Sequence, residues 1–178
     1  MLKHGGLLVQ LRVRRLLDRA ILPSRHNPRD AGLDLYAIDD VVIRPGQVLK
    51  VPTGIAIQPD SIPGGPEALV SLVWDKSGRA ASGLKTMGGV IDEPYTGELL
   101  IVVTNLNHGP IFEAMAQGNV PAVNRALEAA TIRIPYGKAI AQLLLQSVRL
   151  ADPIEVAELD ATDRGDRGFG SSDTPGSS

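Results

Sequence analysis

Two acidic side chains and an aromatic ring stand close together in residues 88–97, GGVIDEPYTG. Asp92 and Glu93 follow a short apolar run, and Tyr95 lies in the Pro-Tyr-Thr-Gly turn after them. Strand-forming residues flank the segment on both sides, so it is predicted to be a β-hairpin with its polar residues at the tip. A carboxylate and a ring at such a tip could line a small polar pocket.

A second segment with chemical potential is the small-residue loop 75–82, DKSGRAAS. Glycine lets backbone N–H groups approach an anion, and Lys76 and Ser77 beside Gly78 could add a charge and a hydroxyl. The same residues could also form an ordinary turn. The G-x-x-x-x-G-K-[ST] pattern of a Walker loop does not occur in the sequence.

Two polar residues lie within apolar strand patterns. Asp34 is in the middle of the predicted strand 33–37, where a carboxylate needs a partner, and Gln142 is inside the run AIAQLLLQ. On spacing alone, Asp34 fits a structural ion pair and a functional role equally well.

The last residues, 160–178, read DATDRGDRGFGSSDTPGSS. This composition is typical of a solvated, disordered tail. The tail nevertheless holds a cation, a ring and a hydroxyl on a glycine-rich strap, which is what a closing lid needs: Arg164, Phe169 and Ser171. We expect one β domain over residues 1–160 and a flexible lid segment over 161–178.

The elements that position these residues are predicted to be strands. The chain has 178 residues with 19 Gly and 13 Pro, which favours one all-β domain with many turns. Trp74 is expected to pack in the core. A helical insertion interrupts the β pattern over 106–130, with Asn119 as its helix cap. Predicted strands also include 8–16, a pair at 47–51 and 54–57 broken by a Pro-Thr-Gly turn, and a last short strand at 154–156.

Several classes of function are disfavoured by composition. Cysteine is absent and the three histidines are scattered, so a disulfide framework and a transition-metal centre are not expected. The formal charge of −2 gives no general basic field for nucleic acid. No apolar run approaches the length of a membrane helix, and the first residues lack a signal-peptide pattern. We therefore expect a cytoplasmic protein without nucleic-acid or membrane partners.

Five short segments, taken together, resemble the five motifs of the trimeric dUTP diphosphatases, the dUTPases. They occur in the family's order and span most of residues 7–172. One such segment alone would be weak evidence, but five in order with a GFGS tail are highly specific. The segments are DAGLDLYA at 30–37, DKSGRA at 75–80, GGVIDEPYTGEL at 88–99, YGKAIAQL at 136–143 and DRGDRGFGSS at 163–172.

The resemblance implies a jelly-roll-like β-barrel and a homotrimer whose active sites are shared between subunits. The C-terminal strap of one subunit would close over a site formed by the other two. The implied reaction is hydrolysis of dUTP to dUMP and pyrophosphate with Mg²⁺, which limits uracil in DNA and supplies dUMP.

The resemblance also implies a role for individual residues. Asp92 would orient and deprotonate the water that attacks the α-phosphorus, and Tyr95 would pack on the deoxyribose. Asp34 would hold metal-bound waters or the cation of the second motif. The remaining candidates would bind uracil or phosphate oxygens: Lys76, Ser77, Gly78, Thr86, Gly89, Val90, Ile91, Gln142, Arg164, Phe169, Gly170 and Ser171.

The chain departs from the family pattern at several points. Lys76 stands where the family usually has Arg, which keeps the charge and loses the bidentate fork. Ala139 stands where Arg is common, and Arg167 replaces a customary Gly in the strap. Thr86 occupies a position that is Asn in some members. The 106–130 insertion is outside the common pattern.

Two alternatives belong to other functional classes. A dCTP deaminase shares the fold, and its members carry a catalytic Glu on the strand after the third motif; here that strand reads LLIVVTN, without a carboxylate. A bifunctional relative belongs to the same alternative. A non-catalytic binding or regulatory protein would use the insertion as its working surface.

Overall fold

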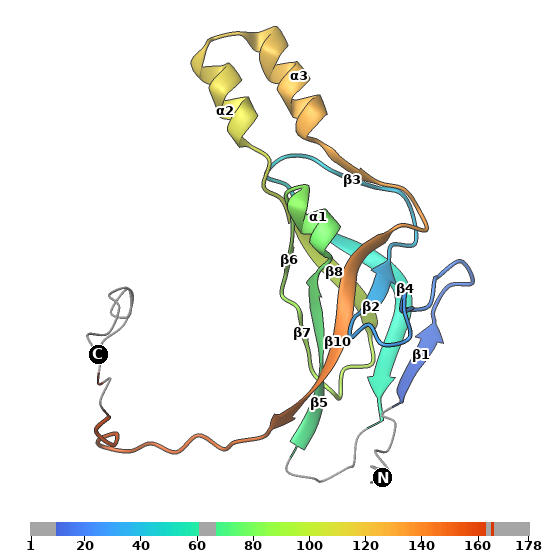
Figure 1. Cartoon of the computed structure of the whole chain (residues 1–178), viewed down its shortest axis with the longest axis vertical. Helices are drawn as coiled ribbons and strands as arrows, with labels where there is room; N and C mark the ends of the chain where they lie inside the picture. Colours follow the sequence, from blue (N-terminus) through green and yellow to red (C-terminus); the bar gives the residue numbers. More distant parts are fainter. Residues whose placement is uncertain (1–9, 61–66, 163–164, 166–178) are drawn as a thin grey trace.

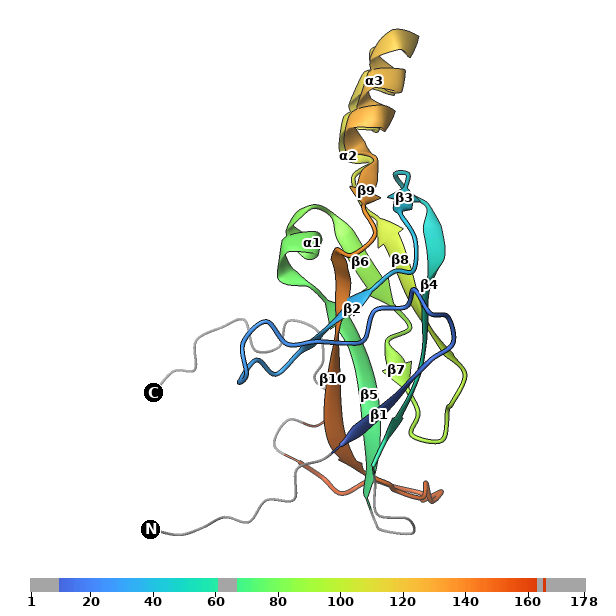
Figure 2. The same ribbon diagram turned by 90° about the vertical axis from the view of Figure 1, so that its right-hand side faces the viewer.

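Antiparallel strands form most of the regular secondary structure, as Figures 1 and 2 show. The structure is a computed structural model that describes residues 10–60, 67–162 and 165. The all-β prediction is confirmed in this part of the chain. The strands are β1 (Leu11–Arg15), β2 (Leu33–Tyr36), β3 (Val41–Ile43), β4 (Val48–Pro59), β5 (Glu67–Asp75), β6 (Leu84–Met87), β7 (Val90–Ile91), β8 (Glu98–Asn105), β9 (Ile132–Ile134) and β10 (Ala139–Arg149); the helices are α1 (Ser77–Ala81), α2 (Gly109–Ala116) and α3 (Val120–Ala130).

Two four-stranded sheets enclose the core. Their strand orders are β1-β4-β8-β6 and β2-β10-β5-β7, and β3 pairs with β9 in a separate two-stranded ribbon. The core is aliphatic, as the scarcity of aromatic residues predicts, and draws on both sheets. Its fully buried side chains include Leu35, Ile43, Val51, Ile55, Leu99, Ile101, Val103, Ile134, Ile140 and Leu143.

Strand β4 is continuous where the sequence predicts a break. Its pairing with β8 shifts register between Pro52 and Ala56, so the Pro-Thr-Gly segment forms an irregularity within one strand. At this irregularity the buried hydroxyl of Thr53 replaces a backbone donor, because its Oγ1 donates to the Leu99 carbonyl of β8 at 2.6 Å. The turn residues therefore bend the strand without ending it.

The predicted positions of Trp74 and of a last short strand are also wrong. Trp74 is 56% exposed on β5 instead of lying in the core. Residues 154–156 form no strand: the chain leaves the barrel after β10 as an extended arm (Figure 1), and Ile154 is 81% exposed. A β-ladder requires a neighbouring strand, and the described residues of this chain offer the arm none.

The predicted insertion is a helical hairpin that stands away from the barrel (Figure 2). Asn119 caps α3 as expected, with its Oδ1 accepting the Ala122 N–H at 3.0 Å. The sequence did not reveal α2. Asn105, fully buried at the end of β8, donates from Nδ2 to the carbonyls of Ile43 at 2.9 Å and Ala130 at 2.8 Å. This amide holds both ends of the hairpin at the barrel.

Candidate functional site

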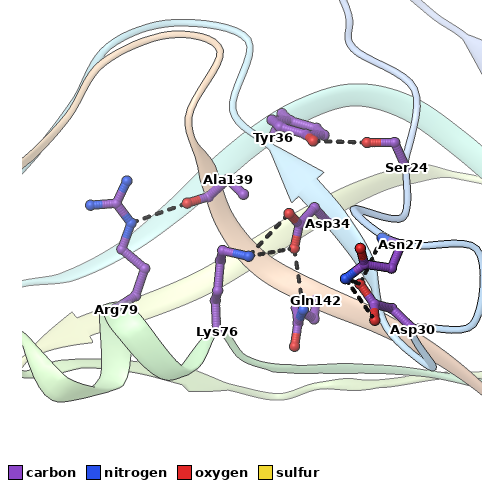
Figure 3. Close-up of polar contacts among 9 residues, drawn as sticks. All are labelled: Ser24, Asn27, Asp30, Asp34, Tyr36, Lys76, Arg79, Ala139 and Gln142. Carbon is purple, nitrogen blue, oxygen red and sulfur yellow. Dashed lines mark hydrogen bonds and ion pairs between the residues drawn. The ribbon is translucent and has the colours of Figure 1, made fainter.

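Three polar side chains from separate segments converge beside α1 (Figure 3). The ammonium Nζ of Lys76 donates to Asp34 Oδ1 at 2.8 Å and to Oδ2 at 3.0 Å. Gln142 Nε2 donates to the same Oδ1 at 3.2 Å. The side chain of Asp34 is 15% exposed and that of Lys76 is 34% exposed, so the pair lies partly out of water. We call these three residues the polar cluster.

Sheet register explains why the polar cluster forms. Gln142 on β10 lies opposite Asp34 on β2 and opposite Trp74 on β5, two residues before Lys76. Gly32, just before β2, makes room for the amide, because a methyl group there would come within 3.1 Å of Gln142 Cδ. Asp34 therefore has the ion-pair partner that its mid-strand position demands.

Helix α1 begins at this cluster, where the sequence indicated a small-residue loop. Ser77 is its first residue, and Gly78 faces open space, since a Cβ there would meet nothing within 4 Å. The guanidinium of Arg79 reaches across to β10, and its Nε donates to the Ala139 carbonyl at 3.0 Å. Sequence reasoning assigned Arg79 no role, and no local signal shows that its side chain reaches β10.

A second acidic residue, Asp75 at the end of β5, links the segment before α1 to strand β6. Its Oδ1 accepts the backbone N–H and the hydroxyl of Thr86, both at 2.7 Å, and its Oδ2 binds the Lys85 ammonium. Burial alone raises the pKa of Asp75, but the hydrogen bonds from Lys85 and Thr86 outweigh it and hold that pKa below its ordinary value. Thr86 is 8% exposed, so its polar groups serve this contact.

Replacing Asp75 by Asn should make the protein less stable at neutral pH and flatten its acid sensitivity. Because the folded-state pKa is lowered, the stability from Asp75 is present above the unfolded pKa and lost as the pH falls through the folded one. At pH 7 we expect Asp75→Asn to cost about 1.5–3 kcal/mol, the usual worth of hydrogen bonds to a charged group. The difference from wild type should shrink below about pH 4.

The measurement is urea unfolding at fixed protein concentration across this pH range. Asp18→Asn, an exposed aspartate on another part of the surface, removes the same charge and is the matched control. An Asp75→Asn deficit that persists unchanged at low pH would contradict the assigned pKa direction.

The predicted hairpin pairing is wrong: β7 pairs with β5 in one sheet and β8 pairs with β4 and β6 in the other, so the strands on either side of the acidic turn do not pair with each other. We keep the name hairpin for residues 88–97, which are held tightly to β5. Val73 donates its N–H to the Gly89 carbonyl at 2.7 Å. A methyl group at Gly89 would lie 2.2 Å from the Val73 carbonyl oxygen, so only glycine permits this approach. The hairpin tip is also tied down, because the Leu69 N–H donates to Glu93 Oε2 at 2.7 Å.

The two residues predicted to act on substrate stand outward from this hairpin. Asp92 is exposed, and its backbone carbonyl closes the turn by accepting the Tyr95 N–H at 3.0 Å. Tyr95 lies over Gly97, where a Cβ would come within 2.5 Å of its hydroxyl oxygen, and this hydroxyl donates to the Glu98 carbonyl at 3.0 Å. The ring is thereby fixed with 47% of its surface exposed.

Asp92 and the polar cluster do not meet within one chain. Ile91 pairs with Ser71, so Asp92 lies beside Val70, whereas Gln142 pairs with Trp74. Asp92 and the polar cluster are therefore separated along β5 by the four residues from Val70 to Trp74, about 13 Å of strand. Arg164, Phe169, Gly170 and Ser171 lie outside the described residues.

The described residues contain no group of three or more His, Cys, Asp or Glu that could hold a metal by themselves. Asp34 is the acidic member of the polar cluster, and it is already bonded by Lys76 and Gln142. Mg²⁺ commonly keeps most of its waters and binds through one or two carboxylates together with substrate phosphates. The donor set fits a metal of that kind. Separately, the described chain has no helix long and apolar enough to cross a membrane.

Fold and site together define a jelly-roll-like β protein with a partly buried Lys-Asp-Gln cluster and a separate acidic hairpin. The family model described as dUTPase matches residues 18–113 and 106–173. A deoxyuridine 5'-triphosphate nucleotidohydrolase of Mycolicibacterium vanbaalenii is 40% identical over 165 residues, with 88% of this chain and 90% of the relative covered. A deoxyuridine 5'-triphosphate nucleotidohydrolase from Corynebacterium glutamicum is 39% identical, with 92% of this chain and 95% of the relative covered. The chain belongs to the dUTPase family.

Solved structures support the same fold. The dUTPase of Staphylococcus bacteriophage 80alpha, solved with dUpNHpp, matches with a TM-score of 0.72 and 26% identity, covering 92% of this chain and 98% of its own. The dUTPase of phage phi11 of S. aureus, described with a species-specific insert, matches with a TM-score of 0.64 and 26% identity, covering 86% and 99%. A mutant of the phi11 enzyme is described with a structural Mg(II) ion. The jelly-roll-like fold expected from the resemblance is confirmed.

Proposed function

We propose that this chain is a dUTP diphosphatase that hydrolyses dUTP to dUMP and pyrophosphate. The observation that carries this conclusion is the convergence of Asp34, Lys76 and Gln142 from three of the five motif segments. Phosphoryl chemistry needs positioned charge and hydrogen-bond donors more than covalent help from the protein. A half-buried ammonium beside an amide supplies both to phosphate oxygens, together with Ser77 and the backbone around Gly78.

The hairpin supplies the second half of the chemistry in this proposal. Its exposed carboxylate, Asp92, acts as general base for the water that attacks the α-phosphorus. The fixed ring of Tyr95 packs on the deoxyribose and leaves no room for a 2′-hydroxyl. Backbone groups of residues 89–91 bind uracil, and the close approach of Gly89 to β5 keeps this part of the hairpin narrow. Thr86 supports the site through Asp75.

We infer that Mg²⁺ enters with the triphosphate. The metal would supply charge neutralisation on the phosphate oxygens. Asp34 would hold its bound waters, and the Lys76 ammonium orients this carboxylate through bonds to both of its oxygens.

We propose a homotrimer in which the hairpin of one subunit faces the polar cluster of another. Support comes from the roughly 13 Å of β5 that separate the two within one chain. Exposed apolar side chains along the arm after β10 also favour association, among them Leu150, Ile154, Val156 and Leu159. Beside them an apolar groove of about 730 Å³ runs between Val70, Val148 and the hairpin residue Pro94. The lid role of residues 161–178 and the cytoplasmic location stay expectations from the sequence.

A direct test compares two substrates. The chain is incubated with dUTP and with dCTP in separate reactions containing Mg²⁺, and pyrophosphate and ammonia are followed. We expect pyrophosphate from dUTP and no ammonia from dCTP, because β8, the strand after the hairpin, has no carboxylate other than Glu98. Glu98, which begins β8, is already bonded to the Gly54 N–H at 2.9 Å. Ammonia from dCTP would select the deaminase, and absence of both products would select a binding protein.

A further inference from the structure

The charges around the polar cluster are unevenly matched. Lys76 is bonded to Asp34, and Lys85 is bonded to Asp75, so each ammonium has a carboxylate of its own. Arg79, half-buried on α1, has no carboxylate partner within the described residues; its side chain donates to the neutral carbonyl of Ala139. Arg79 therefore brings a positive charge that no carboxylate among the described residues neutralises.

The contact with Ala139 leaves the binding end of Arg79 available. The bond uses Nε, and both terminal amino groups stand clear of the other residues drawn in Figure 3. A guanidinium anchored through Nε keeps a planar pair of donors in a fixed direction, which suits two oxygens of one phosphate. Anchoring also removes part of the rotamer entropy that a free arginine would lose on binding.

The position of Arg79 complements the polar cluster. It contacts β10 at Ala139, and the cluster contacts the same strand at Gln142, about 10 Å or less further along. Hydrogen-bond donors at two points along one strand, the guanidinium of Arg79 and the Lys76 and Gln142 donors of the cluster, suit a linear polyphosphate better than a single phosphate. The guanidinium of Arg79 enters from α1 and lies against the backbone of residue 139.

We propose that Arg79 is a specificity-determining residue that grips the pyrophosphate end of the substrate. The inference rests on the proposed function and adds to it. In that function the hairpin holds the uracil, the sugar and the attacked α-phosphorus, so the leaving pyrophosphate extends toward the cluster and α1. Arg79 supplies the bidentate fork that Lys76 cannot, and it makes affinity depend on the number of phosphates.

The test measures binding of dUpNHpp and of dUMP to the full chain. Arg79→Met keeps the aliphatic stem and removes the fork, so we expect dUpNHpp to bind roughly 10- to 100-fold more weakly, the usual cost of losing hydrogen bonds to a charged group. Binding of dUMP should change less than about twofold, because dUMP lacks the pyrophosphate end. The melting temperature should stay near that of wild type.

Three further variants sharpen this result. Arg79→Lys keeps the charge and a donor for the Ala139 carbonyl, so its affinity should fall between wild type and Arg79→Met. Lys76→Arg in the Arg79→Met background restores a fork nearby and should recover part of the lost affinity. Lys138→Met removes the same charge one residue from Ala139 on an exposed turn, and it should bind dUpNHpp as wild type does.

Three results would overturn the role of Arg79: wild-type affinity for dUpNHpp in Arg79→Met, an equal loss for dUMP, or an equal loss in Lys138→Met. If Arg79→Met does not fold, the test rests on Arg79→Lys. Wild-type affinity for dUpNHpp in that variant overturns the role of Arg79. Failure of the wild-type chain to hydrolyse dUTP overturns the proposed function itself. If the wild-type chain hydrolyses dUTP and substitution of Arg79 does not change the affinity for dUpNHpp, this inference alone is overturned.

Discussion

The Asp92→Asn variant is expected to lose turnover of dUTP while still binding it. An amide of the same shape keeps the hairpin intact, since the turn is closed by the Asp92 backbone carbonyl and the tip is tied through Glu93. It cannot accept the proton of the attacking water, however. Removing a general base typically costs ~10²–10⁴ in rate, so kcat should fall by at least that order. Affinity for dUpNHpp should remain within about threefold of wild type.

The control for this loss is Glu93→Gln in the same hairpin. A glutamine side-chain oxygen can still accept the Leu69 N–H, so the tip should stay in place and turnover should remain close to wild type. The readouts are pyrophosphate release under saturating dUTP and binding of dUpNHpp. Near-normal pyrophosphate release by Asp92→Asn would exclude Asp92 as the base and move the water-activating role to another group.

Two inactive variants are expected to restore activity when their chains are mixed. Lys76→Met removes the ammonium and leaves the Asp34 carboxylate to repel phosphates, so it should be nearly inactive by itself. Asp92→Asn is inactive for a different reason. If each site takes its cluster from one subunit and its hairpin from another, trimers containing both chains hold one intact site each. With random assembly from equal amounts, about a quarter of all sites should work.

The mixture is made by refolding both chains together, and assembly of mixed trimers is checked by mass. A chain carrying both substitutions, refolded with each single variant, is the control. In each of these mixtures one part is defective in every chain, the cluster with Lys76→Met and the hairpin with Asp92→Asn, so activity should stay at background. Mixed trimers without activity would show that each site draws the hairpin and the cluster from one chain. A stable, fully active monomer would contradict the shared site altogether.

The parts of the site that follow from local pattern were predictable. Alternation places Asp34 in a strand, and burial of a carboxylate requires a partner, which the structure supplies as Lys76. The two strands and the turn around residues 88–97 follow from strand formers on both sides of polar residues, but their membership of different sheets does not. Asn119 was recognisable as a helix cap because side-chain capping is local.

What the sequence could not show depends on contacts between distant segments. Nothing local tells that Arg79 reaches the Ala139 carbonyl, 60 residues away. Trp74 was misplaced because hydrophobicity predicts burial and says nothing of which face of β5 lies outward. Residues 154–156 have strand-forming side chains, but a strand exists only with a partner, and propensity cannot supply one. Helix α1 was missed because its small residues suit a turn equally well.

The hydrogen bonds of the Asn105 amide affect how readily the segment between β8 and β9 can be lengthened or shortened. It pins the carbonyl of Ala130 beside β8, so the two ends of the α2–α3 hairpin start and finish at neighbouring points of the barrel. Once the ends of a connection are held together, each doubling of its length costs only about 0.6 kcal/mol of closure entropy. The barrel can therefore accept insertions and deletions between β8 and β9 in evolution, while the arrangement of the polar cluster and the hairpin stays unaltered.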